Sequence, residues 1–568
     1  MSDSNVDKDR QLLIEAGDKG SLSLLRAYTK LSGPGWLQSA LTLGGGSLGS
    51  SLYLGILGGM TLLWLQPFAM ILGVIMMSAI SYVTLSTGER PFRAINNHIN
   101  PVLGWSWLIA ALMANMVWSL PQYSLCFAVC EQNFFPSAFK PDGVLGGENG
   151  KWIVSLAILA ICTLVTWSYG SGNRGVKIYE FVLKIVVAVI VAAFIGVVIR
   201  MAMTGDGIDW SQVLAGFIPN PKQLYAPADS FRALLDGIHD PAARQYWSDL
   251  IVSEQRDVML SAGAAAVGIN MTFLLPYALL SRGWDKPFRG MTIFDLCTGT
   301  FIPFVLATGC IVIAAAQQFH SQTPPGFEFN GDQIVVPDHF KNGYEGMISK
   351  RQETGESDSQ LPVTVSVAEH QIAATLVRRD TFDLASSLKK LFANKEGKGG
   401  ELFANLIFGV GVAGMTMSSI SLMMLISGFV ICEILDRPPR GWIFRIGCLA
   451  SATGVLWPLI WTGGSKAWLT VIAGVFGAML LPIAYVTFWV MMNSRSMLGD
   501  EVPRGWRWFL WNFLLAIAAI AATAAGISAI IKKSGYYGLI FVAAYLALVF
   551  VFHKKMKNKK SLNTGSAS

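Results

Sequence analysis

The sequence Gly33-Pro34-Gly35-Trp36-Leu37-Gln38-Ser39 opens the first hydrophobic segment, and Gly44-Gly45-Gly46-Ser47 interrupts that segment a few residues later. A glycine triplet weakens a helix and leaves backbone amides and carbonyls without side-chain cover. Within a membrane, such backbone is tolerated only where it faces a cavity or a ligand. The stretch therefore predicts a membrane-spanning helix that breaks at a binding site.

The composition is that of a membrane protein with many spans. Of the 568 residues, 53% are hydrophobic, 14% are charged and 18 are tryptophan, and the mean hydropathy is +0.48. A helix needs on the order of 20 apolar residues to cross a bilayer. We expect an all-α polytopic membrane protein with 12 transmembrane helices, at residues 37–57, 62–85, 102–129, 153–167, 178–199, 259–280, 291–316, 403–435, 443–461, 468–492, 508–531 and 536–552.

Basic residues in the short connections predict the orientation of the chain. Lys and Arg are retained on the cytoplasmic side, and here they occupy alternate connections and the tail 554–560. We therefore expect both termini in the cytoplasm and the protein in the inner or plasma membrane of the cell. The first 30 residues lack the apolar core of a signal peptide. Because these charges set topology, the net charge of +7 indicates no nucleic-acid partner; the expected partner is the lipid bilayer, and the expected state is a monomer or weak oligomer.

Two long polar connections separate groups of spans. They contain Pro, Gly and charged residues and are expected to cap the outer face, and the alternating run 362–367 is expected to pair as a small strand. The predicted organisation is a cytoplasmic segment 1–32, spans one to five in 33–203, an outer loop 204–254, spans six to ten in 255–495 with an outer insertion 321–401, spans eleven and twelve in 496–553, and a basic cytoplasmic tail 554–568.

The sixth span carries a second break signal. It reads Gly268-Ile269-Asn270-Met271-Thr272-Phe273-Leu274-Leu275-Pro276-Tyr277-Ala278. Because an internal proline removes a hydrogen bond and collides with the preceding turn, we expect the helix to split around Leu275–Tyr277. Either break alone could be a harmless kink, since Gly and Pro are common in such helices. Breaks five spans apart are typical of two inverted five-helix repeats with a substrate site between them.

Other chemistry is not indicated by the sequence. The seven cysteines lie in spans or at their edges, and the six histidines lie in connections or at span ends. No nucleophile–base pair, phosphate-binding loop or metal-ligand cluster is recognisable. We therefore expect no enzyme activity, no catalytic residue, no cofactor and no bound structural metal.

These motifs resemble the Nramp family of divalent-metal transporters, which have the LeuT-type fold. In that family the first span reads Gly-Pro-x-(aromatic)-Leu-x-Ser and then Asp-Pro-Gly-Asn, which fall on residues 33–39 and 44–47 here. The Met-Pro-His of its sixth span falls on Leu275-Pro276-Tyr277, and further matches lie at 481–484 and 493–499. The resemblance covers the first ten spans. It implies secondary active transport by alternating access, through two inverted five-helix repeats followed by two extra C-terminal helices.

The metal ligands of the family are replaced in this chain. The replacements are Gly44 for Asp, Ser47 for Asn, Leu275 for Met, Tyr277 for His and Gly474 for Gln, and 118–122 lacks the family's acidic residue. Transition metals need nitrogen, sulfur or carboxylate donors, and Mg²⁺ is normally held by at least one carboxylate. We therefore expect that this chain has lost transition-metal transport.

The same break suits a small anion. Half-helices point backbone N–H groups and positive dipole ends into such a cavity, and glycines allow close approach. The leading hypothesis is bicarbonate; the alternatives are a divalent metal (Mg²⁺ or Mn²⁺), another small solute such as an amino acid, or a receptor or scaffold that transports nothing. The expected substrate-binding residues are Gly44, Gly45, Gly46, Ser47, Thr42, Gln38, Asn270, Leu275, Pro276 and Tyr277.

The eighth span holds the candidate coupling site. Thr416 and Ser419 place hydroxyls at helical spacing, and LeuT-type transporters hold Na⁺ between their first and eighth helices. An anion entering against the membrane potential needs a coupling partner, which we expect to be Na⁺ or H⁺. The alternative is that these small residues serve helix packing.

Overall fold

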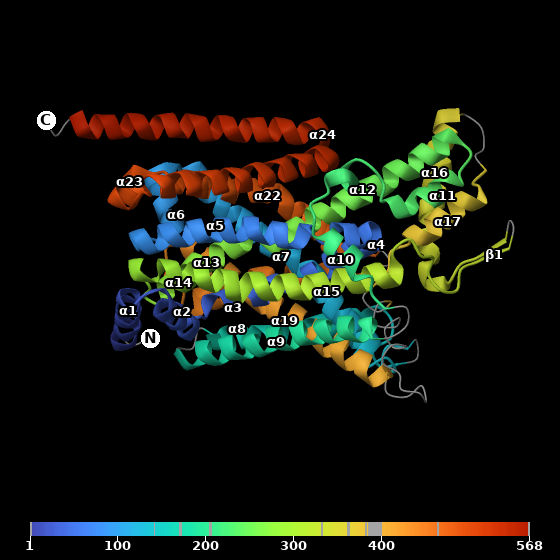
Figure 1. The fold of residues 1–568 in the computed structure, drawn as a ribbon, viewed down its shortest axis with the longest axis horizontal. Helices are drawn as coiled ribbons and strands as arrows, with labels where there is room; N and C mark the ends of the chain where they lie inside the picture. The colour runs from blue at the N-terminus through green and yellow to red at the C-terminus, as the bar shows by residue number, and fades with distance from the viewer. Residues whose placement is uncertain are drawn as a thin grey trace.

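The computed structural model describes residues 3–140, 143–169, 173–203, 207–330, 333–359, 364–380, 383, 400–462 and 465–565. Long helices run side by side between two ends of the molecule (Figure 1). The main helices are α3 (Pro34–Thr42), α4 (Gly45–Gly58), α5 (Leu65–Thr87), α7 (Pro101–Val129), α8 (Glu148–Tyr169), α9 (Asn173–Ala202), α12 (Pro241–Ala266), α13 (Ile269–Ser281), α15 (Ile302–Phe319), α19 (Gly400–Ile434), α22 (Trp468–Met492) and α24 (Trp506–Gly565).

Further elements lie between these helices. Three of them, the 3₁₀ stretch η8 and the α-helical pieces α20 and α21 that it joins, make up the ninth predicted span. The shorter elements include α1 (Asp3–Asp18), α2 (Ser21–Leu31), α6 (Pro91–Ala94), α10 (Trp210–Gly216), α11 (Arg232–Asp236), α14 (Arg289–Asp295), the π-helical η7 (Leu296–Phe301), α16 (Asp338–Ser359), α17 (Val367–Leu376), α20 (Gly441–Cys448), η8 (Leu449–Leu456), α21 (Trp457–Ile460) and α23 (Arg495–Leu498).

The first span is broken where the glycine triplet predicted. Helix α3 ends at Thr42, α4 begins at Gly45, and the two pieces are bent by 56°. Every residue of α4 is buried, including its three serines, so this half-helix lies wholly inside the bundle.

The sixth span is also broken, but not where we expected. Helix α12 ends at Ala266 and α13 begins at Ile269, with Val267 and Gly268 in extended backbone. Pro276 lies inside α13 without interrupting it, so the expected split at Leu275–Tyr277 is wrong. Proline removes a single hydrogen bond, and membrane helices tolerate that loss when neighbouring helices enclose them; α13 is buried from Ile269 to Leu279.

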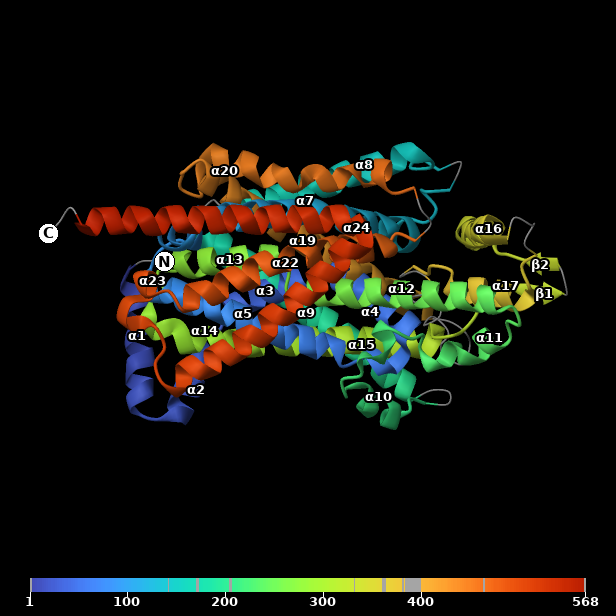
Figure 2. The same cartoon turned by 90° about the horizontal axis from the view of Figure 1, so that it is seen from above.

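Ten of the described helices are long and apolar enough to span a membrane, or up to eleven spans if the bent α3–α4 pair is one. The last of the ten, within α24, bends sharply at Gly535, which has a φ of 54°. Its two parts run back past each other across the molecule (Figures 1 and 2). The fold of many apolar helices is confirmed, whereas the number 12 remains a prediction.

The two termini lie at the same end of the molecule, together with α1 and α2 (Figure 2). The polar elements α10, α11, α16 and α17 lie at the opposite end, with an antiparallel pair formed by β1 (Glu328–Asn330) and β2 (Gln333–Val335). Residues 362 and 363 of the expected strand lie outside the described residues, and Ser366 instead caps α17. Ser366 favours the helix because its side chain and that of Glu369 bond each other's backbone N–H groups.

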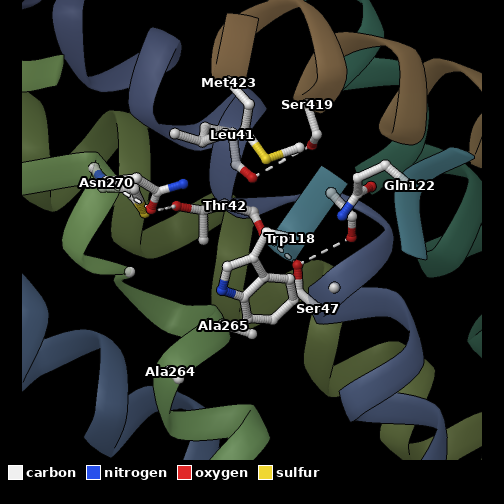
Figure 3. A pocket seen from close by; sticks show the side chains of 14 residues that line it. Leu41, Thr42, Ser47, Trp118, Gln122, Ala264, Ala265, Asn270, Ser419 and Met423 are labelled. Atoms are coloured by element: carbon white, nitrogen blue, oxygen red, sulfur yellow. Dashed lines mark hydrogen bonds between the residues drawn. The ribbon is translucent and has the colours of Figure 1, made fainter. Parts of the chain in front are cut away.

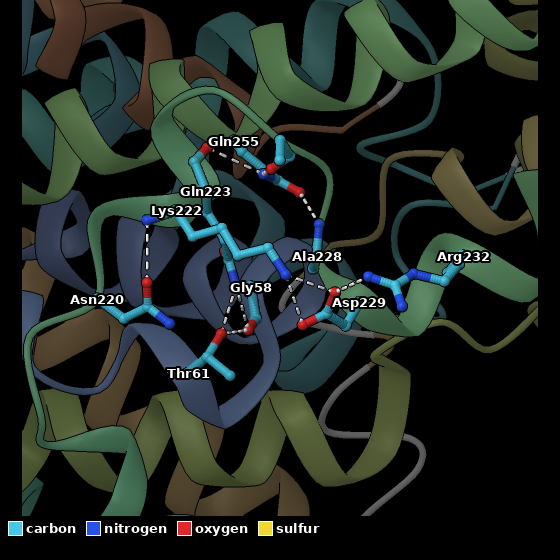
Figure 4. Close-up of polar contacts among 10 residues, drawn as sticks. Gly58, Thr61, Asn220, Lys222, Gln223, Ala228, Asp229, Arg232 and Gln255 are labelled. Atoms are coloured by element: carbon cyan, nitrogen blue, oxygen red, sulfur yellow. Dashed lines mark hydrogen bonds and ion pairs between the residues drawn. The ribbon is translucent and has the colours of Figure 1, made fainter.

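The connection before α12 is fastened to the helix bundle by side-chain amides (Figure 4). Gln223 Nε2 donates to the Gly58 carbonyl at the end of α4, at 3.3 Å. Gln255 of α12 accepts from the Ala228 N–H at 2.9 Å and donates to the Gln223 carbonyl at 3.1 Å. These bonds hold the connection before α12 over the end of the bundle that lies opposite the termini.

Candidate substrate site

A small cavity lies where the two broken spans meet. Its volume is about 40 Å³, enough for roughly one to three water molecules. The ends of α3 and α12 and the starts of α4 and α13 surround it, with α7 and α19 alongside (Figure 3). It is lined by Leu41, Thr42, Gly44, Gly46, Ser47, Trp118, Gln122, Ala264, Ala265, Gly268, Asn270, Met271, Ser419 and Met423.

Gln122 and Ser47 organise the start of α4. The Gly45 N–H donates to Gln122 Oε1 at 2.9 Å, which fixes the orientation of the Gln122 carboxamide. Its Nε2, a pure donor, belongs to a side chain that lines the cavity. Ser47 Oγ donates to the Thr42 carbonyl and lies 3.2 Å from the Gly44 carbonyl. The serine hydroxyl thus joins the two half-helices.

Asn270 is held at the start of α13 by a chain of buried polar groups. Its Oδ1 accepts from the Met271 N–H at 3.0 Å, and its Nδ2 donates to Asn115 Oδ1 at 3.0 Å. Asn115 in turn donates to Ser427 Oγ at 3.2 Å, and Ser427 is bonded to Ser451. These hydrogen bonds restrict the Asn270 side chain, which lines the cavity.

The two candidate coupling residues on α19 differ in position. Ser419 lines the cavity, and its Oγ donates to the Leu41 carbonyl of α3 at 3.5 Å. The neighbouring Ser418 donates to the Ala40 carbonyl at 3.4 Å. Thr416 instead donates to carbonyls of its own helix. Ser419, with Ser418, is therefore the hydroxyl that faces the carbonyl end of α3.

The glycines of the break are required by close packing. A Cβ atom added to Gly44 would collide with Ser419 Oγ, and one added to Gly46 would collide with the Trp118 ring. At Gly45 the added atom would lie 2.8 Å from Gln122 Oε1. Side chains from α7 and α19 therefore occupy the space that larger residues on this loop would need.

The structure brings together only part of the predicted site. Thr42, Gly44, Gly46, Ser47 and Asn270 line the cavity. Gly45 contributes its N–H to Gln122 rather than to the cavity. The residues outside the lining are Gln38, Leu275, Pro276 and Tyr277.

These four residues lie outside for identifiable reasons. Gln38 precedes Thr42 by one helical turn and is fully buried within α3. Because the real break precedes Ile269, α13 carries residues 275–277 about two turns away from the cavity. Tyr277 stacks there on Phe273, with ring centroids 4.6 Å apart.

The α7 side of the site was not among the predicted residues. Trp118 and Gln122 lie four residues apart and share one face of α7, and this spacing beside Pro121 is the signal that was available. Met271 and Met423 were also missed, since a methionine in an apolar span carries no distinctive pattern.

The site is electrically neutral. None of its 14 lining residues is Asp, Glu, His, Cys, Lys or Arg. Across the described part of the chain, no group of three or more of the usual metal-ligating side chains is close enough to hold an ion. The cavity offers hydroxyls, carboxamides, two thioethers and backbone groups at four helix ends.

Two broken spans that meet at a buried cavity, within a bundle of apolar helices, define a multi-pass membrane transporter of the LeuT type. The family model described as "Natural resistance-associated macrophage protein-like", Nramp, matches residues 35–330 and 372–522. The chain therefore belongs to the Nramp family. The unmatched residues 331–371 fall within the predicted outer insertion.

Solved structures agree on the fold. A mutant of the manganese transporter of Eremococcus coleocola is similar with a TM-score of 0.57 and 12% identity, covering 94% of this chain and 96% of that one. The same transporter in complex with an aromatic bis-isothiourea substituted compound has a TM-score of 0.57 and 12% identity, covering 95% and 97%. None of the curated protein sequences compared matches this chain.

Proposed function

We propose that this protein is a secondary active transporter that carries a small anion, with bicarbonate as the leading candidate. One observation carries the proposal: the cavity at the helix breaks contains neutral hydrogen-bond donors and no carboxylate or imidazole. The side-chain amides of Gln122 and Asn270 and the N-terminal end of α4 beyond Gly45, whose own N–H is bound by Gln122, supply those donors. Bicarbonate is planar, compact and singly charged, and it can accept several of them at once.

The electrostatics favour an anion over a divalent cation. Placing a charge in a poorly solvated site costs several kcal/mol unless a partner compensates for it, and here the compensation comes from amide and helix-end dipoles. Mg²⁺ keeps several waters and is usually held through a carboxylate. A cavity of about 40 Å³ has room for only a few waters, so Mg²⁺ would have to shed most of its hydration shell there, with no carboxylate in the lining to replace it.

The second candidate is a divalent metal ion. It is favoured by membership of the Nramp family and by the likeness to a protein named a manganese transporter, whereas no comparison supports an anion. In this case the backbone carbonyls of the breaks and the thioethers of Met271 and Met423 would act as ligands. A third candidate, a receptor or scaffold, does not explain why a helix break with its cavity is retained.

The proposal includes coupling to Na⁺, with H⁺ as the alternative. Driving one negative charge into a cell costs about 2.3 kcal/mol per 100 mV. The hydroxyls of Ser418 and Ser419 face the Ala40 and Leu41 carbonyls, and hard oxygen donors of this kind suit Na⁺. We also propose that the end carrying both termini faces the cytoplasm of a cell membrane, because the basic connections lie at that end.

Uptake into proteoliposomes tests the function directly. One preparation is assayed with an internal pH dye and with an internal Mn²⁺-quenched dye, with and without an inward Na⁺ gradient. We expect bicarbonate-dependent internal alkalinisation that rises with the Na⁺ gradient, and no Mn²⁺ quench. Mn²⁺ entry without a bicarbonate response would establish the second candidate and refute the anion proposal. Protein-free liposomes correct for CO₂ diffusion.

A further inference from the structure

A second, apolar cavity lies on the flank of the bundle. It is a groove of about 470 Å³ between α5, α12, α22 and α24, a size typical of sites for lipids and other hydrophobic ligands. Representative lining residues are Phe68, Leu72, Met259, Leu481, Ala521 and Ala525.

The groove exists because one face of α24 carries small side chains. Ala518, Ala521, Ala522 and Ala525 recur at helical spacing and all line it. A row of methyl groups leaves a slot between α24 and its neighbours that larger residues would fill. Phe68, 37% exposed, and Ala524, also exposed, lie at its opening, so the slot is open towards the hydrocarbon region of the bilayer.

The floor of the groove is also a wall of the substrate cavity. Ala264, in the last turn of α12 before the break, lines both cavities. Its relative exposure is only 1%, so this buried residue is shared by the walls of the two spaces. An occupant of the groove would therefore press on the helix end that shapes the substrate site.

The rim of the groove at the end opposite the termini is basic. Arg256 lines the groove and is exposed, and its Nε donates to the Leu224 carbonyl. One turn beyond the lining residue Ser528, Lys532 and Lys533 bind Asp257 at 2.7 and 3.2 Å. Arg256, Lys532 and Lys533 together with Asp257 leave a local net charge of +2. Glu254 adds none, because it is paired with Arg378.

Arg256 lies at headgroup depth if the breaks lie at the membrane midplane. It precedes Ala266, the last residue of α12, by ten positions, which is about 15 Å at 1.5 Å per residue. Half of a hydrocarbon core of about 30 Å is the same distance. The apolar slot thus falls within the acyl-chain region, and the guanidinium falls at the level of the phosphates.

We propose that this groove binds an anionic phospholipid from the leaflet opposite the termini, and that the bound lipid regulates transport through Ala264. An acyl chain fills the slot beside the alanines of α24, and the phosphate pairs with Arg256. The binding stands independently of the substrate, whereas the regulatory effect rests on the proposed transport function.

Lipid binding is tested on the full-length protein, delipidated in detergent, by native mass spectrometry with added phosphatidylglycerol or phosphatidylcholine. We expect preferential binding of phosphatidylglycerol. Arg256→Gln should weaken phosphatidylglycerol binding roughly fivefold, the effect of one cation near a membrane surface. Ala521→Phe should remove the tight site by filling the slot.

The matched controls are Lys341→Gln, an exposed cation on α16, and Ala547→Phe, an exposed alanine in the second half of α24.

Equal affinity for the two lipids, or unchanged binding in both groove variants, would overturn the proposal. Regulation is measured as the ratio of uptake in phosphatidylglycerol-containing and pure phosphatidylcholine liposomes. Arg256→Gln should bring that ratio close to one while leaving uptake in phosphatidylcholine unchanged; a ratio equal to wild type would refute the regulatory role. Failure of the substrate proposal alone would leave the mass-spectrometric binding intact, so the two failures can be distinguished.

Discussion

At the residue scale, Gln122 is the position at which a single substitution of equal size adds a charge to the neutral substrate site. Gln122→Glu preserves the size of the side chain and can still accept from the Gly45 N–H, but it replaces a donor with a negative charge. A hydrogen bond to a charged group contributes about 1.5–3 kcal/mol, so we expect bicarbonate uptake to fall roughly tenfold or more. The added carboxylate should also create measurable Mn²⁺ binding, which isothermal titration calorimetry can detect.

The matched control for this change is Gln122→Leu, which removes the amide donor and acceptor without adding a charge or a metal ligand. It should weaken anion uptake but leave Mn²⁺ binding undetectable. Restoring the family's carboxylate by Gly44→Asp would be a poorer test, because its Cβ would collide with Ser419 Oγ. Undiminished bicarbonate uptake by Gln122→Glu would show that this amide does not face the substrate.

At the element scale, Asp295 of α14 caps the start of α3. Its carboxylate accepts from the Gly33 N–H at 3.1 Å, from the Gly35 N–H at 2.5 Å and from the Ser32 hydroxyl. A carboxylate at a helix N-terminus is favourable both as a hydrogen-bond acceptor and as a charge beside the dipole. A Cβ at Gly35 would collide with the Asp295 backbone, which explains the second glycine of the Gly-Pro-Gly motif.

We therefore expect Asp295→Asn to loosen α3 at the terminus-bearing end of the molecule, at a cost of about 1–2 kcal/mol. Hydrogen–deuterium exchange should rise in residues 33–40, and thermal unfolding should occur at a lower temperature. Asp285→Asn, which changes a half-exposed carboxylate paired with Arg10, should have a much smaller effect. Unchanged exchange in residues 33–40 would show that the cap does not hold α3.

The same elements show what sequence can predict. The break at Gly44 was predictable because a glycine triplet acts locally on the backbone. The predicted position of the second break, at Leu275–Tyr277 instead of Val267, was wrong because the effect of a proline on a helix depends on packing. Here packing keeps α13 continuous through Pro276. Gln122, Met423 and the cap from Asp295 depend on contacts between distant helices, and a single sequence carries no signal for such pairs.

At the scale of the whole molecule, a segment of the insertion closes the end opposite the termini. The Arg379 carbonyl accepts from Tyr53 of α4 at 2.8 Å, and the Arg379 guanidinium donates to the Phe319 carbonyl of α15 at 3.4 Å. Asp380 accepts from Ser465 Oγ at 2.7 Å and from the Ala467 N–H at 3.0 Å, just before α22. Residues 377–380 thus connect α4, α15 and the start of α22 at the end of the bundle opposite the termini.

Closure by this segment should depend on pH. Burial raises the pKa of Asp380 above its ordinary value of 3.8, against the opposing influence of the nearby Lys466, and burial also raises the pKa of Asp383. The docked segment therefore binds protons more readily than the undocked one, so docking is strengthened as pH falls through the raised pKa and weakened above it.

Protection of residues 377–380 from hydrogen exchange, corrected for the intrinsic rate, should increase as the pH is lowered from neutral towards 3.8. Asp380→Asn, which mimics the protonated form, should reduce that dependence, whereas Asp338→Asn, at an exposed position of the same insertion, should keep it. Protection that decreased on acidification in the wild type would show that ionised Asp380, bonded to Ser465 and Ala467, is what holds the segment closed.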